Sequence, residues 1–136
     1  MWSDRYYYLN IYKDENLSSN RDTKELRDFI VRIPELKQVS KYEFKNIEPF
    51  PFTQLLLLNA SSIDNWSDSD TNSKHTNLIT IVCGKGENVD YGELKRVFIQ
   101  IASFLNWKLV DEETDDGIEY FTIWEPRNNT NAQQNV

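Results

Sequence analysis

The stretch DYGELKRVFIQIASFLNWKLVD, residues 90–111, determines the architecture of this chain. Its apolar residues recur at i, i+3, i+4, i+7 and i+11, which places them on one face of a helix. The residues on that face are Leu94, Val97, Phe98, Ile101 and Leu105. Asp90 and Glu93 have the spacing of a capping box, and Asn106 is the expected exit. A strand over 107–110 follows, so the stretch predicts a helix that leads directly into a sheet.

A second helix is expected nearer the N-terminus. Its apolar stripe has the same i, i+3, i+4, i+7 spacing. The stripe consists of Leu26, Phe29, Ile30 and Ile33. The helix is expected to begin at Asp22 or Thr23, and Pro34 is expected to end or kink it, because proline lacks the N–H that a helix interior needs. Leu36 and Val39 are expected in a short turn that follows it.

The other apolar segments predict strands, because they are rich in β-branched and aromatic residues. These strands are expected at residues 6–12, 41–47, 52–60, 78–83 and 118–124. The uninterrupted run Leu55–Leu58 is typical of a central strand with both faces buried. Residues 61–77 are polar and acidic without any period, so a long surface loop is expected there.

The predicted order of elements is β-α-β-β-β-α-β-β. Each helix has a single apolar stripe, and two such helices must cover an apolar sheet face. We therefore expect an α+β fold. It is a two-layer sandwich with both helices packed on one face of a mostly antiparallel sheet, a variant of the ferredoxin-like arrangement. A single domain is expected over residues 1–125, followed by a disordered Asn- and Gln-rich tail at 126–136.

The formal net charge of −7 is concentrated in two short segments of the 136 residues. Residues 111–119 carry −6 and residues 64–70 carry −3, which leaves the remainder of the chain at +2. This distribution argues against nucleic acid or an anionic membrane as a partner. It permits a basic protein partner, a metal ion, or no role beyond solubility.

Cys83 is the single cysteine, which excludes an internal disulfide. The N-terminus has neither the basic region nor the apolar region of a signal peptide. No apolar run approaches the roughly 20 residues needed to span a bilayer. A reducing cytoplasm is therefore the expected compartment, and no cofactor is expected, since no cofactor-binding motif occurs.

The most acidic part of the chain lies between two expected strands, where Asp115-Asp116-Gly117 predicts a hairpin turn. Three interpretations stay open: a docking surface for a basic partner, a solvated hairpin tip, and a calcium loop. The calcium spacing is incomplete, because Gly117 falls one place late and Thr122 stands at the twelfth position. The candidate partner-binding residues here are Asp111, Glu112, Glu113, Asp115, Asp116 and Glu119.

The second acidic segment contains an aromatic residue, Trp66, without apolar neighbours. An exposed tryptophan flanked by carboxylates would act as an interface anchor, whereas a loop that folds back would bury it. On the first interpretation, the further partner-binding candidates are Asp64, Trp66, Asp68 and Asp70.

Cys83 and His75 are the only residues of their kinds. A nucleophilic pair would need them within hydrogen-bond reach, but Cys83 ends an apolar strand and is expected to be a buried small hydrophobe. One Cys and one His also leave a zinc site short of ligands. Two alternatives to a binding protein stay open: a small hydrolase or ligand-binding enzyme that uses carboxylates and His75, and a structural subunit of a larger complex.

Residues 101–117 contain the pattern IA-x-x-LNW-x-x-x-DEET-x-x-G. This pattern resembles the helix, strand and acidic turn of small acidic bacterial immunity proteins. Those proteins neutralise the cognate toxins of contact-dependent growth inhibition and other polymorphic toxin systems. The resemblance implies a non-enzymatic inhibitor that binds a basic toxin domain, often a nuclease. It assigns no residue roles, so the contacts proposed above rest on charge and, for Trp66, on its aromatic side chain.

Overall fold

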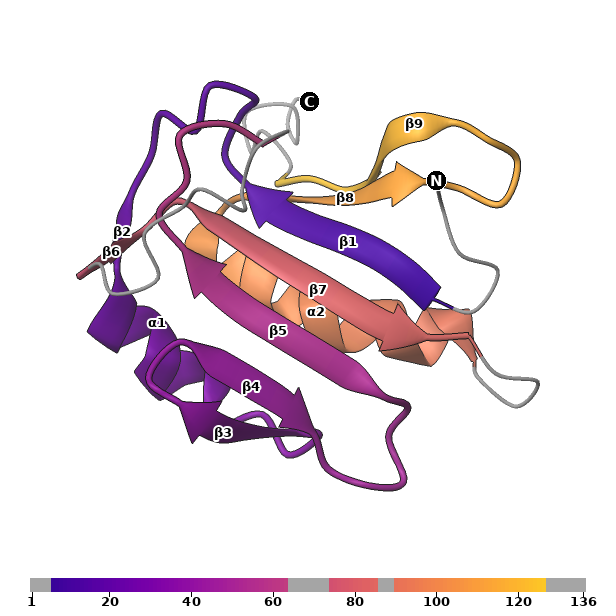
Figure 1. Ribbon diagram of the computed structural model, residues 1–136, viewed down its shortest axis with the longest axis horizontal. Coiled ribbons are helices and arrows are strands. Elements are labelled where there is room, and N and C mark those ends of the chain that lie inside the picture. The colour runs from indigo at the N-terminus through magenta and orange to yellow at the C-terminus, as the bar shows by residue number, and fades with distance from the viewer. Residues whose placement is uncertain (1–5, 64–73, 86–89, 127–136) are drawn as a thin grey trace, which may run out of the picture.

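The computed structural model describes residues 6–63, 74–85 and 90–126, which form an α+β fold with two helices and a seven-stranded sheet (Figure 1). The helices are α1 (Thr23–Ile30) and α2 (Tyr91–Leu105). The strands of the large sheet are β1 (Tyr6–Tyr12), β3 (Leu36–Ser40), β4 (Glu43–Asn46), β5 (Thr53–Leu58), β7 (Leu78–Gly84), β8 (Lys108–Glu113) and β9 (Glu119–Trp124). Two short strands, β2 (Arg21–Asp22) and β6 (His75–Thr76), form a separate antiparallel pair.

The large sheet has the strand order β3-β4-β5-β7-β1-β8-β9, and its neighbouring strands are antiparallel. The connection that contains α1 also contains β3 and β4, and it joins β1 to β5 on the far side of β7. The connection through α2 joins β7 to β8 on the far side of β1. Each helix-containing connection therefore crosses one strand of opposite direction, and β1 and β7 occupy the middle of the sheet.

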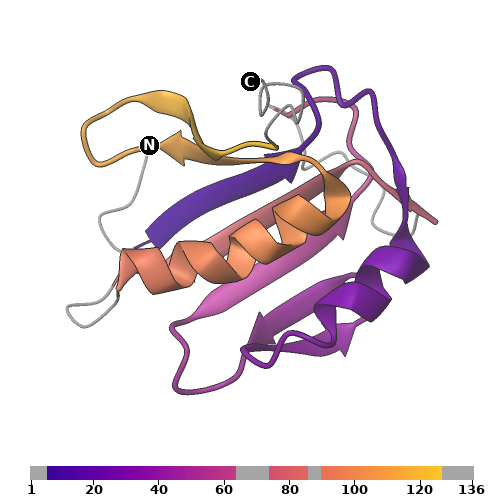
Figure 2. The same ribbon diagram turned by 180° about the vertical axis from the view of Figure 1, so that it is seen from behind.

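Both helices lie on the same face of the sheet, behind it in Figure 1 and in front of it in Figure 2. The main hydrophobic core fills the space between them and the sheet. It includes Leu26 and Ile30 of α1, Leu9 and Ile11 of β1, and the predicted apolar face of α2. The five residues predicted for that face of α2 are at most 2% exposed, so the amphipathic pattern is confirmed.

The two ends of α2 follow the predicted signals. The Asp90 carboxylate accepts hydrogen bonds from two backbone N–H groups of the first turn, one of them that of Glu93, at 2.9 and 3.4 Å. Asn106 ends the helix with φ 62°, a left-handed conformation that asparagine tolerates. The N–H of Trp107 then donates to the carbonyl of Ala102 at 2.9 Å. This tight exit returns the chain to the sheet as β8 within two residues.

β5 is buried on the side of the helices and, at Leu58, on the other side, so the two-sided burial that the run of leucines predicted is confirmed in part. Leu55 and Leu57 belong to the main core, on the side of the helices. Leu58 faces the other way into a second, smaller cluster, against which the half-buried Leu56 packs. The remaining buried residues of that cluster are Tyr12, Leu17, Ala60, Leu78 and Val110. The sheet face opposite the helices is therefore partly covered.

The region after α1 differs from the prediction. α1 ends at Ile30, before Pro34, and the predicted turn at Leu36 and Val39 is wrong because both residues belong to strand β3. β3 pairs with β4 as a hairpin, so the backbone hydrogen bonds of this segment are satisfied across strands. Leu36 is 2% exposed and Val39 is 46% exposed. Spacing alone did not separate a turn from an edge strand with a single buried side chain.

The expected surface loop over 61–77 contains regular structure at its C-terminal end. His75 lies in β6, which pairs with β2 just before α1. The side chain of Asn77 accepts from the N–H of Ala60 at 2.8 Å and donates to its carbonyl at 3.0 Å. These paired hydrogen bonds fasten the returning chain to the end of β5.

β9 forms one edge of the sheet, and its backbone is irregular. Tyr120 has φ 50°, a left-handed conformation that is uncommon for an aromatic residue. The pairing register with β8 shifts between Leu109 and Val110, which leaves Ile123 as an extra residue in β9. Such bulges bend a strand and increase its twist.

Neither described helix combines the length and the apolar character that crossing a membrane would require. Residues 1–5, 64–73, 86–89 and 127–136 lie outside the described residues. Nearly all of the predicted disordered tail at 126–136 therefore falls outside them. The single domain predicted over 1–125 stays a prediction.

Leu57→Ala is expected to reduce the free energy of unfolding by about 2–5 kcal/mol, because it leaves a cavity in the main core, where Leu57 is 1% exposed. Leu56→Ala removes the same atoms from the neighbouring half-buried position and is expected to cost clearly less. Urea denaturation of both variants measures the difference. Equal losses would contradict the assignment of Leu57 to the face covered by the helices.

Candidate functional site

The six acidic residues predicted in the C-terminal half lie on one hairpin, formed by β8 and β9 (Figure 1). Gly117 in the turn has φ 82°, which favours glycine, and its N–H donates to the carbonyl of Thr114 at 2.9 Å. Thr114 also donates its backbone N–H to the carbonyl of Ile118 at 2.9 Å. The predicted Asp-Gly hairpin is therefore confirmed, and its turn is held by its own backbone.

Asp111 lies inside the protein, with only 3% of its surface exposed. Its carboxylate accepts a hydrogen bond from the hydroxyl of Tyr91 at 3.3 Å and from the backbone N–H of Glu113 at 3.2 Å. Burial raises the pKa of Asp111, although these hydrogen bonds and the charge of Lys85 act in the opposite direction. Asp111 belongs to the lining of the cavity described below.

Two more of the predicted acids have partners within the chain. Glu112 accepts a hydrogen bond from the side-chain amide of Asn10 at 3.0 Å. Asp115 forms an ion pair with Lys85, with 2.6 Å between the carboxylate oxygen and the ammonium nitrogen. The Asp115 side chain is nevertheless 71% exposed, so this pair adds little stability. Internal pairing therefore reduces the charge that the hairpin offers to a partner.

The last three predicted acids, Glu113, Asp116 and Glu119, form no ion pair among the residues that the structure describes. Asp116 and Glu119 are exposed and Glu113 is half-buried. Beside them, Ile118 is 51% exposed and Phe121 is 47% exposed. We call these five residues the hairpin tip. It combines unneutralised carboxylates with exposed apolar groups.

A cavity of about 250 Å³, which we call the hairpin pocket, lies where the hairpin meets the first turns of α2. The residues that line it include Tyr7, Tyr91, Lys95, Asp111, Asp116 and Phe121. The rings of Tyr7 and Tyr91 are stacked, with centroids 4.4 Å apart and planes 20° apart. The ammonium of Lys95 lies 4.6 Å from the ring centroid of Tyr91, and that of Lys85 lies 4.8 Å from the ring centroid of Tyr7.

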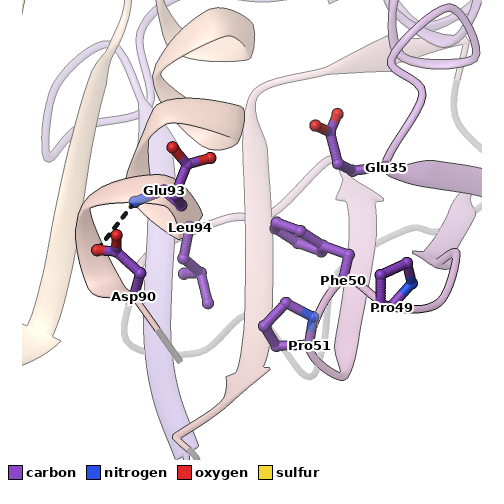
Figure 3. A pocket seen from close by; sticks show the side chains of 7 residues that line it. All are labelled: Glu35, Pro49, Phe50, Pro51, Asp90, Glu93 and Leu94. Atoms are coloured by element: carbon purple, nitrogen blue, oxygen red, sulfur yellow. Dashed lines mark hydrogen bonds between the residues drawn. The ribbon is translucent and has the colours of Figure 1, made fainter. Parts of the chain in front are cut away.

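A second cavity of about 430 Å³ lies beside the N-terminus of α2, and we call it the proline pocket (Figure 3). It is lined by Glu35, Pro49, Phe50, Pro51, Asp90, Glu93 and Leu94. Its carboxylates already have roles within the chain. Asp90 caps α2, and the guanidinium of Arg96 lies 2.9 Å from Glu93 and 3.9 Å from Glu35. One oxygen of Glu35 is buried without a hydrogen-bond partner.

Within the described residues, Cys83 and His75 do not come together as a catalytic pair. Cys83 is fully buried, and burial raises the pKa of its thiol far above the usual range, so it is the predicted small hydrophobe and not a nucleophile. His75 is exposed in β6 and lines neither pocket. The described residues contain no group of three or more His, Cys, Asp or Glu side chains that could hold a metal ion. The calcium spacing at 111, 113 and 115 therefore does not form a ligand set.

The four candidates of the other acidic segment, Asp64, Trp66, Asp68 and Asp70, lie outside the described residues.

The sequence patterns did not indicate the aromatic side of the hairpin pocket. One signal was present, because Tyr91 precedes Leu94 by three residues and Lys95 by four, which places all three near one side of α2. No spacing in the sequence indicated that Phe121 of β9 would join them.

Asp111→Asn is expected to stabilise the protein at pH values above the raised pKa of Asp111. The folded pKa of Asp111 lies above its ordinary value of 3.8, so the folded state binds the proton more tightly than the unfolded state. Stability contributed by protonated Asp111 is therefore lost as the pH rises from 3.8 through the raised pKa. Asparagine has no such proton to lose, and it keeps an acceptor for Glu113.

The measurement is the melting temperature by circular dichroism from about pH 3 to about pH 7. The advantage of Asp111→Asn over wild type is expected to grow across this range. A gain of about 1 kcal/mol corresponds to about 3–5 °C for a chain of this size. Asp116→Asn, at an exposed position on the same hairpin, is the control and should leave the curve unchanged. A pH-independent difference for Asp111→Asn would contradict the assignment.

No protein-family model, curated protein or solved structure matches this chain. The comparisons therefore supply neither a family nor an activity. What remains for a functional conclusion is the chemistry of the described side chains: an acidic and partly apolar hairpin tip, with a small cavity at its base.

Proposed function

We propose that the chain is a non-enzymatic binding protein that docks a basic region of another protein on its hairpin tip. The observation that carries this proposal is the absence, within the described residues, of an ion pair at Glu113, Asp116 and Glu119. Ile118 and Phe121 lie exposed beside them. Unneutralised charge next to exposed apolar groups is the combination that a specific interface uses.

The two kinds of group would contribute differently to binding. Exposed carboxylates mainly speed the association with a basic partner, and they do so less at high salt. Exposed aromatic and aliphatic side chains, once buried in the complex, supply most of the affinity. The hairpin offers both on a short element whose turn is fixed by backbone hydrogen bonds. A rigid surface of this kind loses little conformational entropy on binding.

We further propose that this binding protein is an immunity protein and that its partner is a cognate basic toxin, possibly a nuclease domain. The support is the resemblance of residues 101–117 to acidic immunity proteins and the negative charge of the hairpin. Such an inhibitor would act in the cytoplasm. Asp64, Trp66, Asp68 and Asp70 are proposed as a second group of contacts.

We infer that the fold is a two-layer, ferredoxin-like variant. Four strands support this inference, and along the chain they are β1, β5, β7 and β8. In the sheet they lie in the order fourth, first, third, second (β8-β1-β7-β5), which is the ferredoxin-like order. Each helix-containing connection crosses one antiparallel strand, as in the split β-α-β unit. On this interpretation, the β3–β4 hairpin and β9 are additions at the two edges, and β9 contributes Glu119 and Phe121 to the hairpin tip.

The test of the proposed function uses the gene that directly precedes the gene for this chain, because an immunity gene lies next to its toxin gene. Its product is expressed in a bacterial host with and without this chain. Growth arrest that the chain relieves is the expected result. If the neighbouring product is harmless, or if the chain gives no relief from its toxicity, the immunity proposal is wrong.

Asp116→Lys with Glu119→Lys is expected to slow association with the basic partner about tenfold to a hundredfold and to abolish the protection of growth. Asp28→Lys with Glu48→Lys reverses two exposed acids elsewhere on the molecule, at the cost of the surface ion pair between Asp28 and Lys24, and serves as the control for net charge. Association rates are measured by surface plasmon resonance at low and high salt. Equal effects of the two double variants would show that net charge, and not the hairpin tip, governs binding.

A further inference from the structure

We propose that the hairpin pocket receives one arginine side chain of the basic partner. This inference rests on the proposed function, because it names the chemical group that the docking surface recognises. The pocket opens between the hairpin and the first turns of α2, so a partner on the hairpin tip would reach it directly. Asp116 and Phe121 belong to both the tip and the pocket lining.

The size of the pocket favours a side chain over a free ligand. Its volume is about 250 Å³, whereas pockets for drug-sized ligands and cofactors occupy roughly 300–1,000 Å³. A planar group that enters it would meet the rings of Tyr91 and Phe121 in its lining. The guanidinium group of arginine is planar, stacks on aromatic rings and loses less hydration than an ammonium group. Arginine is also enriched among the residues that dominate protein interfaces.

The charge of the pocket also favours a cation. Asp111, Asp115 and Asp116 line it, and the neighbouring cations are Lys95 and Lys85. Lys85 is paired with Asp115, whereas neither Asp111 nor Asp116 forms an ion pair among the described residues. Asp111 is 3% exposed, and a buried carboxylate is screened less by water than a surface one. A guanidinium in the pocket would compensate this buried charge.

A cation of the chain already lies over one ring of the pocket. Lys95 lies over the ring of Tyr91 at 4.6 Å from the centroid, four residues further along α2. An arginine that enters the pocket would compete with Lys95 for that ring face. Removal of the Lys95 ammonium is therefore expected to strengthen binding, an effect opposite to that of removing other lining groups.

The proline pocket is the weaker candidate for a cation. Its Asp90 is engaged in capping α2, and the chain's own Arg96 lies within 2.9 Å of Glu93 and 3.9 Å of Glu35. A guanidinium is thus already present beside those carboxylates. Among the residues that the structure describes, the lining of the hairpin pocket contains no arginine.

The probe for the test is N-acetylarginine N-methylamide, titrated into the ¹⁵N-labelled full chain and followed by NMR. Shift changes are expected at Tyr91, Asp111 and Phe121, and the lysine analogue should bind more weakly. The citrulline analogue has nearly the same shape without the charge, and it should cause no changes. Changes confined to other regions, equal changes with citrulline, or a lysine analogue that binds as tightly would each overturn the proposal.

Two substitutions test the lining directly. Phe121→Ala is expected to raise the Kd of the arginine probe about two- to fivefold, the fold-change of one exposed cation–π contact. Phe52→Ala removes a ring that is 45% exposed, against 47% for Phe121, and is the control that should leave the Kd unchanged. Lys95→Met should lower the Kd. A Kd unaffected by Phe121→Ala, or raised by Lys95→Met, would overturn the proposal.

The failure of this inference is distinguishable from the failure of the proposed function. If the chain protects growth and its hairpin variants lose that protection, but the arginine probe fails the tests above, only the arginine assignment is wrong. If the chain gives no protection, the immunity function is wrong whatever the probe does.

Discussion

The packing of α2 against the sheet fixes the positions of the other elements in this structure. Its apolar face covers the middle strands, where Leu9 and Ile11 of β1 are fully buried. α2 ends at Asn106, and β8 begins two residues later beside β1. The resulting register places Asp111 opposite Leu9 and within reach of the Tyr91 hydroxyl. The packing of the apolar face of α2 thus also determines where the acidic hairpin meets the rest of the protein.

The acidic residues of the hairpin do not form one uniform surface. Asp111 is interior, and Glu112 and Asp115 have partners in the chain. The remaining three form no ion pair within the described residues, and they lie next to exposed apolar groups. The distinction matters because a buried carboxylate influences the cavity around it, while exposed carboxylates influence the approach of a partner from a distance.

The sequence predicted the parts of the fold that depend on periodicity and on local chemistry. The buried face of α2, its cap at Asp90, its exit at Asn106 and the burial of the β5 leucines in the main core are all of this kind. The strand at Leu36 escaped prediction, because an edge strand with one buried side chain has no period to detect. The pairing of β2 with β6 joins segments about fifty residues apart, which local patterns do not encode.

The candidate site was predicted less completely, for a related reason. Charge counting found the acidic hairpin, but it treated every carboxylate as exposed. The burial of Asp111 follows from the register between β8 and β1, which is a property of the assembled sheet. The pocket likewise draws Tyr7, Tyr91 and Phe121 from three separate elements. Each is an ordinary aromatic residue in its own segment, and only the fold brings them together.

The irregular backbone of β9 has a consequence for how copies of this chain behave toward one another. An edge strand that exposes apolar side chains would ordinarily invite open-ended growth of the sheet into aggregates. The left-handed Tyr120 and the bulge at Ile123 interrupt the regular row of hydrogen-bonding groups such growth needs. Identical copies would also bring like charges together, since each carries −7. The edge strand β9 can therefore expose apolar side chains to a different protein while pairing between copies of this chain is disfavoured.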